Sequence, residues 1–111
     1  MKQVNLLIKE KTSYDTVEVF KLLREHYLNK CSFYKAEVNY DVNRLNDESD
    51  PPEKWTLQLY ADIFKISVYG LTAGYGGTGP LHLKEILDLC GEFENTDRVL
   101  KEGFVTFFKK W

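Results

Sequence analysis

The chain has 111 residues, which is enough for one domain with a modest core, and residues 1–111 are expected to form a single domain. Apolar residues make up 43% and aromatic residues 14% of the sequence, which excludes a chain that is disordered throughout. The formal net charge of −2 disfavours broad binding to the nucleic-acid backbone, although a local basic patch stays compatible with it.

The N-terminal residues predict a cytoplasmic protein. The apolar stretch at residues 4–8 is interrupted by Asn5 and is too short for a secretion signal or a membrane span. Because the cytosol is reducing, Cys31 and Cys90 are expected to be free thiols. In an oxidising compartment the alternative is a disulfide between them.

Residues 3–9 and 16–30 predict a strand followed by a helix. The first segment alternates apolar and polar residues, as a strand with one buried face does. The second segment has helical spacing, and Asp15 is its predicted N-cap. The predicted apolar stripe of this helix consists of Val19, Phe20, Leu23 and Tyr27.

Residues 32–44 show the clearest strand pattern in the chain. Tyr34 and Val38 are among the residues expected on a buried face, and Lys35 and Glu37 are among those expected on a solvent face. One buried face and one wet face are typical of an antiparallel sheet.

The following segments predict a loop and then more strand. Residues 45–54 are acidic and contain two prolines, which predicts an irregular connection. Residues 55–71 alternate like a strand but change phase near Asp62. The phase change indicates either a bulged strand or two strands joined by a tight turn, and both alternatives stay open.

The last third of the chain predicts a second helix and a final strand or tail. Residues 80–90 have helical spacing and stop at Gly91, and residues 104–111 are rich in apolar side chains. The resulting order is β-α-β-β-(β)-α-β. This order predicts an α+β fold with a small antiparallel or mixed sheet and two helices packed on it, and the ferredoxin-like arrangement is the nearest named fold.

A glycine-rich loop precedes the second helix and is the least ordinary feature of the sequence. Five of the seven glycines lie between Gly70 and Gly79. With Gly79 as N-cap and Pro80 as the first helical residue, the N–H groups of Leu81 and His82 would be free at the positive end of the helix. Glycines followed by a helix N-terminus can form an anion site.

This loop supplies the candidate binding site. Tyr75 offers a ring that could stack on a base or a sugar. The spacing is neither that of dinucleotide-binding loops nor that of P-loops. The structural alternative is a tight strand-to-helix turn in which Thr78 caps the helix. The candidate ligand-binding residues are Tyr75, Gly76, Gly77, Thr78, Gly79 and His82.

The segment Gly74-Tyr75-Gly76-Gly77-Thr78-Gly79-Pro80, followed by Leu83 and Leu87, resembles a G-Y-G-G-(S/T)-G-P…L…L segment in small bacterial and phage proteins of unassigned function. The resemblance covers about twenty residues and implies a loop that such proteins share. It implies no activity and no catalytic residue.

Other side chains give weaker signals. His82 with Glu85 as a partner could act as a base, which makes a hydrolase a third hypothesis. The spacing of the histidines and cysteines is not that of a metal site, so neither a metal nor a cofactor is expected.

The C-terminal residues predict self-association. Residues 104–108 carry apolar side chains on both faces of the predicted strand, and two short helices are expected to cover only one face. A second copy of the chain would cover the other face, whereas the competing explanation is that residues 92–101 fold back over it. The residues expected at the dimer seam are Phe104, Phe107, Phe108 and Trp111.

These observations favour a small non-enzymatic protein that binds a phosphate-bearing or nucleotide-like ligand at the glycine loop. A phage or bacterial protein that sequesters a nucleotide signal is one concrete form of this hypothesis. The alternative is a protein–protein interaction module of the immunity or inhibitor type, in which the glycine loop is purely structural.

Overall fold

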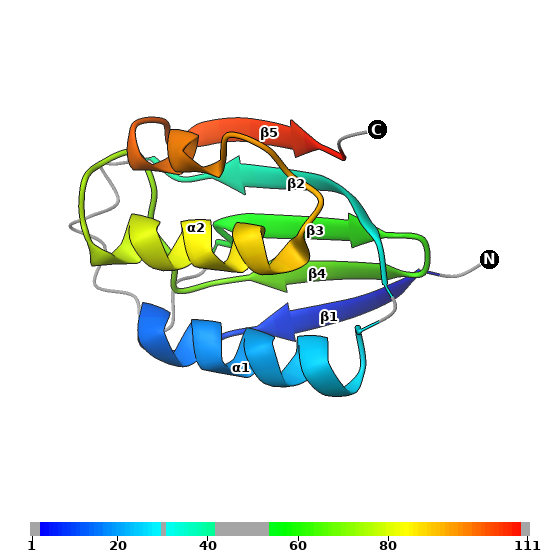
Figure 1. The fold of residues 1–111 in the computed structure, drawn as a ribbon. Coiled ribbons are helices and arrows are strands. Elements are labelled where there is room, and N and C mark those ends of the chain that lie inside the picture. Colours follow the sequence, from blue (N-terminus) through cyan, green and yellow to red (C-terminus); the bar gives the residue numbers. More distant parts are fainter. Residues whose placement is uncertain (1–2, 30, 42–53, 110–111) are drawn as a thin grey trace.

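The computed structural model describes residues 3–29, 31–41 and 54–109. The predicted acidic loop falls almost wholly outside these ranges, as does Trp111. The structure is a five-stranded mixed sheet with two α-helices, which confirms the predicted α+β class (Figure 1). In chain order the elements are β1 (Val4–Ile8), α1 (Ser13–His26), β2 (Phe33–Asn39), β3 (Leu57–Ala61), β4 (Phe64–Val68), α2 (Thr78–Cys90), the 3-10 helix η2 (Thr96–Leu100) and β5 (Phe104–Phe108).

The sheet has the strand order β1-β4-β3-β2-β5. β1 pairs with β4 in parallel, and the other neighbouring strands pair antiparallel. β3 and β4 are separate strands joined at Asp62 and Ile63, so the phase change in the sequence marks a tight turn. The resulting β-α-β-β-β-α-β order has one strand more than the ferredoxin-like β-α-β-β-α-β unit.

Both helices lie on the same face of the sheet, and the core fills the space between the two layers (Figure 1). Alternate residues of every strand point to this side, because successive side chains of a strand face opposite ways. Both layers contribute fully buried side chains, which include Phe20, Phe33, Leu59, Ile66, Leu83 and Leu87.

The start and the apolar stripe of α1 differ from the prediction. The N-cap is Thr12, whose Oγ1 accepts a hydrogen bond of 3.0 Å from the N–H of Asp15, so Asp15 lies in the first turn. The helix ends at His26. Tyr27 therefore lies outside the stripe and is 75% exposed, while Leu28 is buried in the core.

A register shift at the start of β2 changes the predicted position of Tyr34. The pairing with β3 is irregular between Phe33 and Lys35, as expected of a β-bulge. As a result Phe33 is buried, and Tyr34, which was expected on the buried face, is 42% exposed. From Lys35 onward the strand follows the predicted alternation.

Arg24 ties the ends of the two helices together. Its guanidinium donates to the backbone carbonyls of Leu28, Cys31 and Cys90 and lies over the ring of Phe33. These carbonyls follow the last turn of α1 or end α2, where helical partners are missing. Cys31 and Cys90 are not joined by a disulfide in this structure.

Candidate functional site

The glycine loop connects β4 to α2, and two of its glycines are required by backbone geometry. Gly70 and Gly74 have φ angles of 80° and 88°, a region that side chains disfavour. A Cβ on Gly70 would also lie 2.7 Å from the carbonyl oxygen of Glu10. Turning the chain from the sheet toward α2 therefore requires these glycines.

Two further glycines make room for side chains of the loop itself. A Cβ on Gly77 would lie 2.6 Å from the ring of Tyr75, and a Cβ on Gly79 would overlap Oγ1 of Thr72. The hydroxyls of Thr72 and Tyr75 share a hydrogen bond of 2.9 Å. The ring of Tyr75 packs against the core, so its surface is already partly occupied within the chain.

Gly76 is the exception among the five glycines of the loop. It is exposed, and a Cβ built on it would have no heavy atom within 4 Å. Its φ angle does not lie in the left-handed region. Gly76 is therefore the one position in the loop where a substitution tests ligand binding without disturbing the packing.

The start of α2 differs from the prediction. The N-cap is Gly77 and the helix begins at Thr78, so Gly79 and Pro80 lie within the first turn. The N–H of Leu81 donates to the carbonyl of Gly77 at 3.2 Å and is not free. Thr78 does not cap the helix with its side chain either. Proline fits the first turn because N–H groups there have no helical acceptor.

His82 lies one turn into α2 and contacts α1. Its Nδ1 is hydrogen-bonded to Ser13 Oγ at 2.6 Å, and its ring lies edge-on to the ring of Tyr14. Glu85, the partner expected from the sequence, instead pairs with Lys21 at 3.1 Å. In the described part of the chain, no carboxylate is hydrogen-bonded to the imidazole, so the Ser13–His82 contact reads as a link between the two helices.

A second candidate surface is the sheet face opposite the helices, which we call the open face. Neighbouring strands align their outward side chains in rows across it. The first row consists of Asn5, Lys65, Tyr60, Lys35 and Phe108, and the second consists of Leu7, Ser67, Gln58, Glu37 and Thr106. None of the described helices covers this face, as Figure 1 shows.

Tyr60 is the centre of a polar network on the open face. Its hydroxyl donates to Glu37 at 2.5 Å and lies 2.9 Å from Gln58 Oε1, and Gln58 donates in turn to Ser67. The ammonium groups of Lys35 and Lys65 lie 5.2 Å and 5.8 Å from the centroid of its ring. These contacts fix the ring between two cations.

The network shifts the pKa values of two of its members. Burial is the main cause that raises the pKa of Tyr60 to about 12, and the hydrogen bond to Glu37 raises it further. The same hydrogen bond is the main cause that lowers the pKa of the Glu37 carboxyl. Near neutral pH, Glu37 is therefore an anion and Tyr60 a neutral donor.

The predicted dimer residues separate onto the two faces of β5. Phe107 is only 5% exposed and packs against Phe93, which lies in the segment that folds back before η2. Because Phe107 aligns with the core residues Ala36 and Leu59, the segment before η2 covers the same face of the sheet as the helices, and not the second face over which the competing explanation had it fold. Phe104 and Phe108 point to the open face and are 65% and 67% exposed. Of the predicted seam, these two rings are the described residues that a partner could reach.

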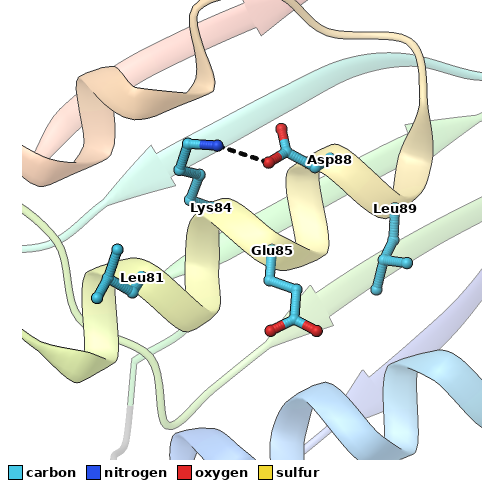
Figure 2. Close-up of a pocket in the computed structure, with 5 residues that line it drawn as sticks. All are labelled: Leu81, Lys84, Glu85, Asp88 and Leu89. Carbon is cyan, nitrogen blue, oxygen red and sulfur yellow. Dashed lines mark hydrogen bonds and ion pairs between the residues drawn. The ribbon is translucent and has the colours of Figure 1, made fainter.

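A pocket of about 380 Å³ lies along the outer side of α2 (Figure 2). Leu81 and Leu89 line it together with three charged residues. Figure 2 shows Lys84 bonded to Asp88, at 2.7 Å, and Glu85 directed toward α1. Because the charged groups of this pocket already bind other side chains, it offers little to a polar ligand.

Comparison of the chain with protein-family models, curated proteins and solved structures finds no match. The resemblance of the glycine segment to small bacterial and phage proteins stays a prediction. Within the residues that the structure describes, no helix is long and apolar enough to cross a membrane. The same residues contain no group of three or more His, Cys, Asp or Glu side chains that could hold a metal ion.

Proposed function

We propose that the protein is a small, non-enzymatic, cytoplasmic binding module whose contact surface is the open face of the sheet. In this proposal the glycine loop shapes the connection between β4 and α2 and is not itself the binding site. The proposal shares with the protein–protein alternative of the sequence analysis a purely structural glycine loop, but it does not restrict the partner to a protein.

The exposure of Phe104 and Phe108 carries the proposal. Burying a phenylalanine side chain stabilises a fold by about 1.5–3 kcal/mol, and this fold forgoes most of that at both positions. The two rings lie at opposite ends of β5 on the same face, with Thr106 between them. Exposed apolar rings on one face and beside a polar network are typical of binding surfaces. The packing of Gly77 and Gly79 against loop side chains supports the same conclusion, because it gives those glycines a role without a ligand.

Site-specific photo-crosslinking in the native cells tests this proposal without a prior choice of partner. Benzoylphenylalanine placed at Phe108 should give adducts of raised mass. The matched control is Leu22 on α1, which is 58% exposed on the helical side and should give none. If the crosslinker at position 108 gives no adducts, the proposal is contradicted. If the crosslinker at position 22 or 76 gives adducts in that case, the contact surface lies elsewhere.

A phosphate or nucleotide site at the glycine loop stays the second candidate, favoured by the open space above Gly76. A ligand at a hundred times its Kd should stabilise the fold by about 2.7 kcal/mol, which thermal melting with a panel of nucleotides and cyclic dinucleotides would detect. Gly76→Val should remove that shift if the loop is the site. Gly77→Val is unsuitable because its side chain would collide with Tyr75.

A further inference from the structure

We propose that the open face binds single-stranded nucleic acid. Unpaired bases would stack on Phe104 and Phe108, and phosphates would pair with Lys35 and Lys65. The inference rests on the proposed function, because it names the partner of the same surface.

A row of side chains on the open face alternates cations with rings. From β4 to β5 it runs through Lys65, Tyr60, Lys35 and Phe108, each facing the next across neighbouring strands. Neighbouring strands are about 4.8 Å apart, so the two lysines stand about 10 Å apart with a ring between them. Such a row offers phosphate contacts and stacking surfaces in alternation, as single-stranded nucleic acid requires.

The charges of this row leave cations available for an anionic partner. Glu37 is the one acidic side chain on the open face within the five described strands, and it already accepts a hydrogen bond from Tyr60 and pairs with Lys35 at 3.5 Å. Lys65 is within ion-pair distance of no described carboxylate, but its charge helps to lower the pKa of the Glu37 carboxyl. Lys9, just past the end of β1, lies 4.7 Å from the ring of Tyr69 and adds a third cation.

The local charge is compatible with the formal net charge of −2 of the whole chain. Several of the described acidic residues lie on the helical side, where Lys21, Lys84 and Arg98 pair with carboxylates. Asp41 follows β2 beyond Asn39, which pairs with Phe104, so this carboxylate lies at the Phe104 end of the face and away from Lys35. Within the described strands, the open face thus carries two lysines and one glutamate, which is a small local excess of positive charge.

The chemistry of the face favours nucleic acid over the two other occupants. Lysine is depleted in the centres of protein–protein interfaces, whereas here two lysines flank the central ring. A second copy stacked on this face would bring like charges together. Double-stranded nucleic acid keeps its bases stacked inside, so Phe104 and Phe108 select for unpaired bases.

Fluorescence anisotropy with labelled oligonucleotides of about 12 nucleotides tests the inference on the intact protein. Oligo(dT) and oligo(U) are measured separately, so that the result distinguishes DNA from RNA. We expect Phe108→Thr and Phe104→Thr each to weaken binding by at least about fivefold, from the stacking energy lost per base. Threonine keeps a high strand propensity, and Phe108→Leu keeps the apolar area while removing the ring.

Matched controls separate stacking from charge. Tyr27→Thr removes a ring of similar exposure on the helical side and should leave binding unchanged. An abasic strand of the same length should bind at least about tenfold more weakly than oligo(dT), because it keeps the phosphates and lacks the bases. Lys35→Gln combined with Lys65→Gln should reduce the slope of log Kd against log salt by about 1.4, and Lys84→Gln should not change it.

Three results would overturn the inference. The first is that neither oligonucleotide binds at about 50 mM salt, where electrostatic binding is strong. The second is that the abasic strand binds the protein as tightly as oligo(dT) does, or that Phe108→Thr, shown by circular dichroism to be folded, binds the oligonucleotide as tightly as the wild type does. The third is that sedimentation equilibrium shows the wild type to be a dimer and the double variant Phe104→Thr, Phe108→Thr to be a monomer. That result would make the open face an interface between copies of the chain. If crosslinking at Phe108 then captures protein in nuclease-resistant adducts, the proposed function stands and this inference is wrong.

Discussion

Substituting Gly79 by alanine tests whether the glycine loop is held by packing. The new Cβ would overlap Oγ1 of Thr72, so the Thr72 side chain must move and lose its hydrogen bond to Tyr75. Overpacking of this kind costs about 1–3 kcal/mol and the lost hydrogen bond about 1 kcal/mol more. Alanine regains about 1 kcal/mol over glycine within a helix. The net destabilisation should be about 1–3 kcal/mol, which lowers Tm by roughly 5–12 °C.

Thermal and denaturant unfolding of matched variants provide the assay. Gly76→Ala, which meets no neighbouring atom, should be neutral or stabilise the fold by up to about 1 kcal/mol. The double variant Thr72→Ala, Gly79→Ala should lose less free energy of unfolding than the two single variants together, by about 1 kcal/mol or more, because the overlapping hydroxyl oxygen of Thr72 is gone. If Gly79→Ala and Gly76→Ala unfold alike, the packing explanation of the glycines is refuted.

Three further predictions concern groups outside the loop. Arg24→Met should destabilise the fold by about 3 kcal/mol, measured by urea unfolding, because three carbonyls at the helix ends lose their donor. The pKa of Tyr60 is raised to about 12 in the folded protein, above its value of about 10 in the unfolded chain. The Tyr60 hydroxyl therefore stabilises the fold fully below about pH 10, and this stabilisation is lost as the pH rises to about 12. The tyrosinate absorbance titration of Tyr60→Phe should accordingly lack a step near the upper value. A thiol reagent should label Cys31 in the folded protein and spare Cys90, which is buried and whose thiol pKa burial raises to about 12; equal labelling of both would contradict the core packing.

The fold class was predictable from the sequence because its signals are local. Alternation in residues 32–44 and helical spacing in residues 80–90 reflect which side chains face the core, and the structure keeps the alternation from Lys35 to Asn39 and the helical spacing of α2. The bulge at Phe33 was not predictable, because tertiary pairing with β3 sets it. The N-cap at Thr12 was missed because Asp15 offered a similar local signal three residues later.

The candidate site was less predictable, because its properties depend on neighbours far apart in the chain. A glycine cluster before a helix is compatible with an anion site, and only the contacts of Tyr75 and Thr72 show that two of those glycines make room for side chains. The row on the open face joins Lys35 and Lys65 to Tyr60 through strand order, which the sequence does not encode locally. The sequence indicated this row only through the polar residues on the predicted solvent faces of the strands.

Thermal melting of three proteins against one ligand panel tests most directly whether the open face or the glycine loop is the binding surface. The proteins are the wild type, Gly76→Val, and Phe104→Thr combined with Phe108→Thr, and the panel contains nucleotides, cyclic dinucleotides and single-stranded oligonucleotides. We predict that oligonucleotides raise the Tm of the wild type and of Gly76→Val but leave that of the phenylalanine variant unchanged. A nucleotide that raises the Tm of the wild type and of the phenylalanine variant, but not that of Gly76→Val, would contradict the account.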